Sequence, residues 1–133
     1  MQTFAKPIKA VFFDLGWTLV YPPSGDWEFT QSAKKLFHWD IYTTLDQDRC
    51  KAARRTANDY FLPRHQLSTL EEEYEQFLHY YTTYAGELPE LGVTQEELEV
   101  ITLEKVYQSR HTYRLMDDTK QTLEALKGKY KLG

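Results

Sequence analysis

Residues 9–19 have the sequence KAVFFDLGWTL, and the interpretation of the whole chain starts from this stretch. Its first half is a continuous apolar run, which is typical of a strand buried on both faces, as in a parallel sheet covered by helices. Pro7 before the run and Gly16 after it leave too little length for a buried helix. We therefore expect a strand over residues 8–14 that ends in a carboxylate, Asp14.

Asp14 occupies a position at which α/β proteins often have a ligand-binding or catalytic residue. Ligands of open α/β sheets bind beyond the carboxyl ends of the strands. A carboxylate there can bind Mg²⁺, or it can attack phosphorus or carbon as a nucleophile. The alternative is a simple turn, because Asp and Gly are ordinary turn formers after a strand. The residues alone leave both interpretations open.

The middle of the chain has the apolar periodicity of helices. Asp26 is expected to cap a first helix, and a second is expected to begin near Thr44 and to end at Pro63. Two stretches have the spacing of a capping box. In this motif a Ser or Thr and a Glu three residues later each accept, with their side chain, a hydrogen bond from the backbone N–H of the other. The two stretches are Ser68-Thr69-Leu70-Glu71 and Thr94-Gln95-Glu96-Glu97.

The end of the chain is expected to return to a strand. A last helix is predicted from about Asp118 to Lys127, with Gly128 as its C-cap, and residues 129–133 resemble the start of a second strand. Two strands so far apart in sequence cannot bury themselves as a free-standing sheet. The sequence thus predicts an α/β protein that is mostly helical by content.

Composition excludes several classes of protein. With 133 residues and a net charge of −4, the chain has the size of one domain and lacks the basic surplus typical of nucleic-acid binding. No apolar run exceeds four residues, so no membrane span is predicted. The single cysteine, Cys50, excludes an internal disulfide framework. Together with the absence of a secretory signal, this leads us to expect a cytoplasmic protein.

Residues 11–19 resemble the first motif of the haloacid dehalogenase (HAD) superfamily, in which an apolar strand is followed by Asp-x-Asp-Gly-Thr-Leu. Residues 115–133 resemble the helix and strand entrance that precede the family's second motif. The resemblance implies a partial Rossmann-like core, formed by strand 8–14 and the strand stub 129–133, with a large helical cap inserted between them. It divides the chain into a first core strand and catalytic loop (1–20), a helical cap (21–112) and a return to the core (113–133).

The resemblance also implies roles for individual residues. Asp14 matches the nucleophile that also binds Mg²⁺, and Thr18 matches the threonine that supports the loop. Gly16 stands where the family's phosphatases have a second Asp, so it can offer its backbone carbonyl to the metal but no acid to the leaving group. Trp17 replaces a glycine, and it either lines the substrate entrance or packs against the cap.

These roles imply a Mg²⁺-dependent phosphatase that acts on a small phosphorylated metabolite through an aspartyl-phosphate at Asp14. The later motifs of the family have no match in residues 1–133, so we expect a chain that ends before the second motif, is inactive by itself and self-associates through its incomplete core. The alternative is a non-catalytic helical interaction module, or a degenerate HAD-like protein, that binds partners through the aromatic faces of the cap.

The remaining candidates each have two interpretations. The thiol of Cys50 could be activated by its basic neighbours or simply be packed. Arg54 and Arg55 could contact an anionic substrate, or they could be solvated or form salt bridges. The four histidines show no metal-ligand spacing. Three tyrosines are expected to belong to a core rather than to form a stacking platform: Tyr80, Tyr81 and Tyr84.

Overall fold

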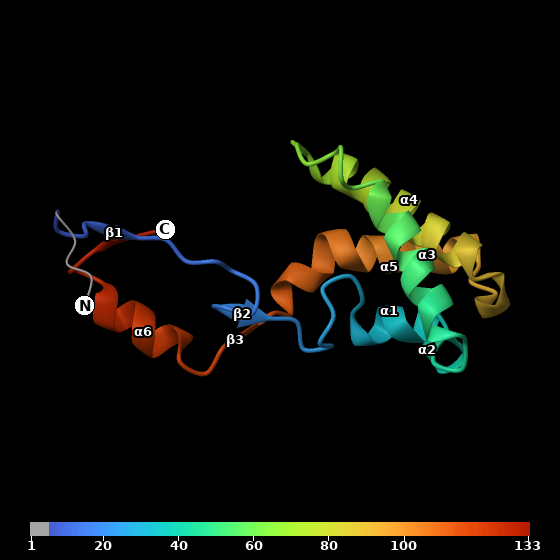
Figure 1. Cartoon of the computed structure of the whole chain (residues 1–133), viewed down its shortest axis with the longest axis horizontal. Coiled ribbons are helices and arrows are strands. Elements are labelled where there is room, and N and C mark those ends of the chain that lie inside the picture. Colours follow the sequence, from blue (N-terminus) through green and yellow to red (C-terminus); the bar gives the residue numbers. More distant parts are fainter. Residues whose placement is uncertain (1–5) are drawn as a thin grey trace.

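The computed structural model describes residues 6–133 as a larger helical part and a smaller part with two strands (Figure 1). The helical part contains α1 (Gln31–Leu36), α2 (Trp39–Tyr42), α3 (Gln47–Asp59), α4 (Leu70–Glu87), η1 (Pro89–Leu91), α5 (Gln95–Leu103), the π-helical η2 (Glu104–Gln108) and η3 (Ser109–His111). The smaller part contains β1 (Ala10–Val11), α6 (Thr119–Leu126) and β4 (Lys131–Leu132). The expected α/β class with a helical majority is thus confirmed at this coarse level.

In the smaller part, β1 and β4 pair in parallel, with Ala10 opposite Lys131. The backbone N–H of Phe13 extends the pairing by donating to the carbonyl of Gly133 at 2.8 Å. Both strands lie where the sequence placed them, but each spans two residues and not the expected 8–14 and 129–133. The expectation of a strand buried on both faces is wrong here, because the side chain of Phe12 is 83% exposed. Within the described residues each strand has a single neighbour, so the outer edge of each strand is unpaired.

The chain leaves and re-enters the smaller part at the same place. There β2 (Val20–Tyr21) and β3 (Arg114–Leu115) pair in an antiparallel sheet (Figure 1). The carbonyl of Leu19 accepts two further hydrogen bonds, from the Met116 N–H at 2.9 Å and from the Thr119 hydroxyl at 2.7 Å. The helical part is therefore an insertion whose entry and exit are held side by side.

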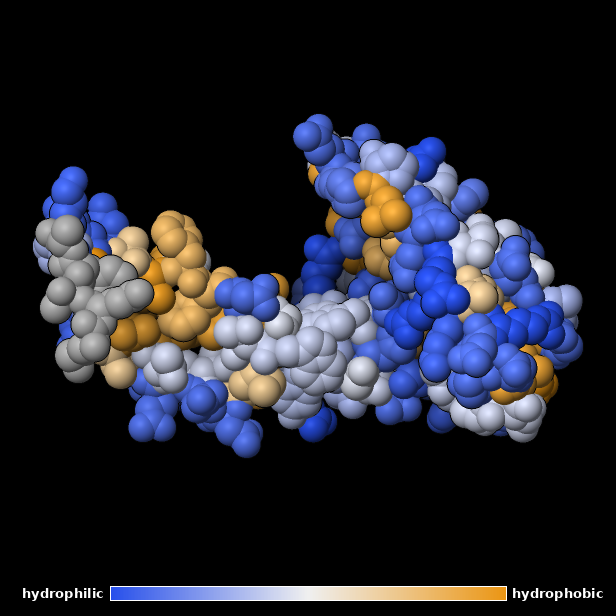
Figure 2. All heavy atoms as spheres, in the orientation of Figure 1, coloured by the Kyte–Doolittle hydropathy of each residue, from blue (hydrophilic) through white to orange (hydrophobic). Residues whose placement is uncertain are grey.

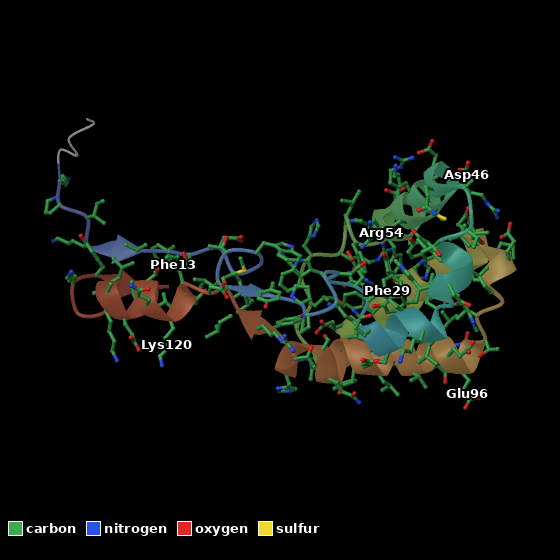
Figure 3. The ribbon with its side chains drawn as sticks, turned by 90° about the horizontal axis from the view of Figure 1, so that it is seen from below. Phe13, Phe29, Asp46, Arg54, Glu96 and Lys120 are labelled. Carbon is green, nitrogen blue, oxygen red and sulfur yellow. The ribbon has the colours of Figure 1, made fainter. Side chains whose placement is uncertain are left out.

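Aromatic side chains form the core of the helical part. Phe29 is fully buried within it (Figure 3), and the centre of its ring lies 5.2 Å from the centre of the Tyr81 ring. The hydroxyls of Tyr84 and Tyr42 lie 2.9 Å apart in a hydrogen bond. Tyr80, Tyr81 and Tyr84 are all fully buried, which confirms their expected place in the core.

The first two helices begin later than the sequence predicts. Thr30 caps α1, while the carboxylate of Asp26 accepts bonds from the backbone N–H groups of Glu28 and Phe29 at 2.9 and 3.3 Å. Asp26 thus forms a local turn and not a helix cap, because an Asp side chain can bond to nearby backbone in either setting. The next long helix, α3, is capped by Asp46 and ends at Asp59, before Pro63.

The capping boxes are present, one of them displaced by a residue. Thr94 and Glu97 cap α5 as expected. At the start of α4 the box uses Thr69 and Glu72, one position after the predicted pair. The last helix begins after Asp118 as predicted, and Gly128 follows it with a φ of +85°, a value that suits glycine. No helix within residues 6–133 combines the length and apolar character needed to cross a bilayer.

Candidate functional site

Asp14 lies just beyond the carboxyl end of β1, and its side chain is exposed. Because β1 and β4 are parallel, their carboxyl ends meet at one edge, and the hydrogen bond between Phe13 and Gly133 brings the two segments together there. This edge is where ligands bind in open α/β sheets. The Asp14 carboxylate therefore lies in solvent, at an edge of the sheet where it could contact a ligand.

A tight loop follows Asp14 and returns Thr18 to it. The backbone N–H of Trp17 donates to the carbonyl of Val20 at 2.8 Å, and the N–H groups of Leu19 and Val20 both donate to that of Leu15. Within this loop the hydroxyl of Thr18 donates to Oδ2 of Asp14 at 3.2 Å. The structure thus brings together the residues expected to be the nucleophile and its support, whose roles stay predictions.

The oxygen atoms near Asp14 are of the kind that Mg²⁺ prefers. Mg²⁺ is usually held by one or two carboxylates together with waters and substrate phosphates. The Asp14 carboxylate is one such ligand, and in residues 6–133 no hydrogen bond reaches the carbonyl of Gly16. The same residues contain no cluster of three or more His, Cys, Asp or Glu side chains that could hold a metal. Asp14 and Gly16 therefore offer oxygens of the right kind for Mg²⁺, but most of its ligands would have to come from water and phosphate.

The side chain of Trp27 fills the space beside Gly16. A Cβ atom at residue 16 would lie 2.8 Å from Cζ2 of Trp27, closer than real contacts allow. The Trp27 ring also packs edge-on against Trp17 at 6.0 Å and against Tyr113 at 5.1 Å. The sequence motif gave no signal of this contact, because the two residues meet only in the folded chain.

Trp17 itself has a strained backbone, with a φ of +59° that a bulky residue adopts only at a cost. Its ring stacks on that of Tyr21, with 6.3 Å between the ring centres, and the residue is 52% exposed. It also borders an open groove of about 570 Å³ together with Met116 and Asp117. Both expectations for Trp17 are therefore geometrically possible, since it packs against Trp27 of the helical part and faces a groove.

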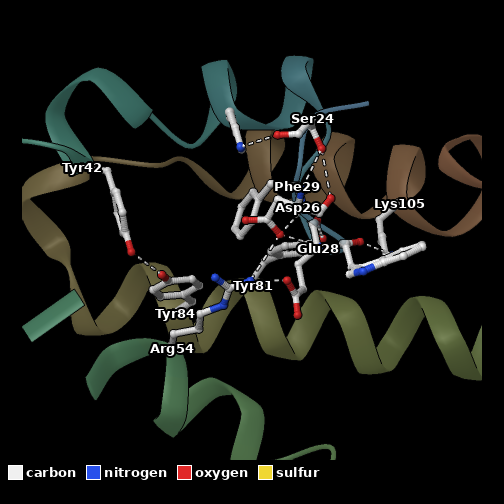
Figure 4. A network of polar contacts seen from close by, with 11 residues as sticks. Ser24, Asp26, Glu28, Phe29, Tyr42, Arg54, Tyr81, Tyr84 and Lys105 are labelled. Carbon is white, nitrogen blue, oxygen red and sulfur yellow. Dashed lines mark hydrogen bonds and ion pairs between the residues drawn. The ribbon is translucent and has the colours of Figure 1, made fainter. Parts of the chain in front are cut away.

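Arg54 takes part in a polar network inside the helical part (Figure 4). Its guanidinium donates to Asp26 at 3.2 Å and to Glu28, whose backbone carbonyl also accepts from Tyr81. Burial raises the pKa of Glu28. Burial also acts to raise the pKa of Asp26, but hydrogen bonds with Glu28 and the charge of Arg54 outweigh it and leave that pKa below its usual value. The salt-bridged interpretation of Arg54 is thus confirmed. Its ion pairs connect α3, which contains Arg54, with the segment that precedes α1.

Cys50 is fully buried in the core of the helical part. Burial raises the pKa of its thiol, whereas an activated cysteine has a lowered one. The packed interpretation of Cys50 is therefore the correct one.

Comparisons of this chain with protein-family models, with curated proteins and with solved structures found no match.

Proposed function

We propose that this chain carries the first motif and the helical cap of a HAD-like hydrolase, a Mg²⁺-dependent phosphatase acting on a small phosphorylated metabolite. The observation that supports this proposal best is the exposed Asp14 carboxylate at the edge shared by two parallel strands, held by the Thr18 hydroxyl at 3.2 Å. The partial Rossmann-like core is part of the proposal, with the β1–β4 pair as its beginning. The proposed compartment is the cytoplasm.

The proposed chemistry has two steps. A carboxylate oxygen of Asp14 attacks phosphorus, the ester P–O bond breaks, and an aspartyl-phosphate forms. Water then attacks that phosphorus, which releases inorganic phosphate and restores the carboxylate. Mg²⁺, when bound, neutralises charge on the phosphoryl oxygens. The leaving alkoxide takes its proton from water, because Gly16 offers no acid, and the missing acid slows the first step by roughly 10²–10⁴-fold.

The helical part would act as the lid of this site. Its two connections to the smaller part lie side by side in the β2–β3 pair, so a hinge there would move the whole helical part as one body. A closed lid would exclude water and select the substrate.

The first test is Mg²⁺ binding followed by NMR on residues 1–133. We expect the backbone amides of residues 14–18 to shift on titration with millimolar Mg²⁺ and to stop shifting in Asp14→Asn. Asp40→Asn is the matched control, because Asp40 is exposed on α2, far along the chain from the loop. Mg²⁺ shifts at the loop that persist in Asp14→Asn would contradict the proposed metal site.

The second test is turnover of p-nitrophenyl phosphate. Residues 1–133 alone should show no measurable Mg²⁺-dependent turnover, because the family's later motifs are not among them. A chain that joins residues 1–133 to the family's later motifs should hydrolyse the ester, and Asp14→Asn should reduce hydrolysis to the background rate. Turnover of such a chain that survives Asp14→Asn would overturn the proposal.

A second candidate function is self-association without catalysis. Phe12 and Leu15 are 83% and 58% exposed, and Figure 2 shows hydrophobic residues gathered on the smaller part. Exposed strands with apolar side chains tend to pair with other chains. Sedimentation velocity should then show dimers that Phe12→Asp disrupts and that the control Leu103→Asp, on α5, does not. A monomer at all concentrations would exclude this candidate.

A further inference from the structure

A cavity of about 230 Å³ lies in the helical part, where the segment before α1 meets η2 and η3. Pro22, Trp27 and Tyr113 contribute apolar walls, and Thr30, Ser32 and Glu104 contribute polar groups. Cavities for drug-sized ligands usually span about 300–1,000 Å³, so this one suits a smaller molecule.

Glu104 is a carboxylate in this cavity without a counter-ion. It is half-buried, and its Oε1 accepts hydrogen bonds from the hydroxyls of Thr30, at 2.5 Å, and of Ser32. Across residues 6–133, no Lys, Arg or His lies within ion-pair distance of it, and its Oε2 accepts no hydrogen bond. Its free Oε2 therefore leaves this carboxylate able to accept from a cationic or strongly donating partner in the cavity.

The nearest lysine in sequence is already engaged elsewhere. The ammonium of Lys105 donates to the carbonyl of Trp27 and lies 5.1 Å from the centre of the Phe77 ring. Glu104 and Lys105 open the π-helical η2, a rare geometry that is frequent at functional sites. The π-helical turn follows α5 directly and carries Glu104 at the junction.

The walls of the cavity favour a ligand with an apolar body. The rings of Trp27 and Tyr113 meet edge-on at 5.1 Å and an interplanar angle of 78°. Aromatic faces attract ammonium groups as well as apolar surface. A carboxylate acceptor beside aromatic walls is therefore complementary to an amine that carries a hydrophobic group.

We propose that this cavity binds a small organic ammonium compound, with its ammonium group on Glu104 and its apolar body against Pro22, Trp27 and Tyr113. The site is independent of the proposed hydrolysis, because none of its polar groups comes from the Asp14 loop. Trp27 nevertheless borders both places, since its ring also lies beside Gly16.

The test uses benzylammonium, with benzyl alcohol as a neutral probe of the same shape and benzoate as an anionic one. NMR titration of residues 1–133 should give shifts at the amides of Trp27, Glu104 and Tyr113 with benzylammonium. Glu104→Gln keeps the size of the side chain and an oxygen acceptor, and it should weaken benzylammonium binding about tenfold, as loss of a partly buried charge pair does.

The matched control is Glu96→Gln, because Glu96 is exposed on the outer side of α5 (Figure 3). This variant should leave the dissociation constant unchanged, and circular dichroism should show that both variants are folded. Three results would each overturn the proposal: benzyl alcohol or benzoate binding as tightly as benzylammonium, an unchanged dissociation constant in Glu104→Gln, or shifts confined to residues outside the cavity.

Discussion

Gly16 is the residue at which the chain departs from the motif it resembles, and it is also the residue against which Trp27 packs. The motif shows only that an acid is missing there. The structure adds that a side chain at residue 16 would meet the Trp27 ring at 2.8 Å. Restoring an acid by Gly16→Asp would therefore also require the Trp27 ring to move, so that variant would change packing and chemistry together.

Replacement of Gly16 by alanine should show this packing directly. We expect Gly16→Ala to lower the free energy of unfolding by about 1–3 kcal/mol, the usual cost of overpacking. The matched control is Gly86→Ala in α4, where an added Cβ meets nothing within 4 Å. That change should raise the free energy of unfolding by about 0.5–1 kcal/mol, because alanine favours a helix. Urea unfolding measures both, and a stabilising Gly16→Ala would contradict the Trp27 contact.

The polar network around Arg54 provides a second prediction for single residues. Arg54→Ala leaves Asp26 and Glu28 without their cation, and the free energy of unfolding should fall by about 1–3 kcal/mol, less than for a fully buried pair. Its neighbour Arg55 is exposed and forms no ion pair within the described part of the chain. Arg55→Ala should therefore change stability by less than about 0.5 kcal/mol. Equal effects in the two variants would refute a structural role for the network.

At the scale of elements, local sequence determines that a helix starts but not always at which residue. Ser68 and Thr69 are both good N-caps, and each has a Glu three residues later. In the structure Thr69 and Glu72 form the box, while the Ser68 backbone N–H donates to the same Glu72 carboxylate at 2.7 Å. The capping side chain is thus Thr69.

A pair of alanine substitutions tests which residue caps α4. Thr69→Ala should lower the thermal midpoint and the free energy of unfolding, the latter by about 1 kcal/mol, because an N–H of the first turn loses its acceptor. Ser68→Ala should have an effect close to zero, since its backbone bond to Glu72 does not need the hydroxyl. A larger loss from Ser68→Ala would show that the box predicted from sequence is the one used in solution.

At the scale of the whole molecule, the two parts differ in how they are stabilised. The helical part has a closed aromatic core, with Phe29, Phe37 and three tyrosines fully buried. The smaller part has two short strands and one helix, and one of its largest apolar side chains, that of Phe12, is mostly in water. Two-stranded sheets are marginal by themselves, so the helical part should dominate the stability of residues 6–133.

The three fully buried tyrosines of α4 make this stability depend on pH in the alkaline range. Burial raises the pKa of Tyr80, Tyr81 and Tyr84 above the value of 10.0. Above about pH 10 the unfolded chain therefore holds fewer protons than the folded one, and stability falls as pH rises. These three groups alone should contribute a slope of about 4 kcal/mol per pH unit. Near-ultraviolet phenolate absorbance should rise together with the loss of the helical circular dichroism signal.

Tyr80→Phe sharpens this prediction. The hydroxyl of Tyr80 is buried and has no hydrogen-bond partner among the described residues. At neutral pH its removal should leave stability unchanged or increase it, because an unsatisfied polar group is lost. Above pH 10 the slope should fall by about 1.4 kcal/mol per pH unit, the contribution of one such group. An unchanged slope in Tyr80→Phe would contradict the raised pKa of this residue.

The sequence alone predicted the features that depend on near neighbours. The apolar run before Asp14 predicted the place of β1, the spacing of Thr94 and Glu97 predicted the start of α5, and Gly128 predicted the end of α6. These features follow from backbone sterics and from hydrogen bonds across a few residues. The contact between Thr18 and Asp14 also lies within this range.

Only the tertiary structure decided which distant groups meet. It placed Trp27 beside Gly16, Arg54 between Asp26 and Glu28, and Glu104 beside the hydroxyls of Thr30 and Ser32. None of these contacts has a local signal, because each joins segments that meet only when the chain folds. The length of β1 was likewise decided by its neighbours, since a strand extends only where another strand can accept its backbone hydrogen bonds.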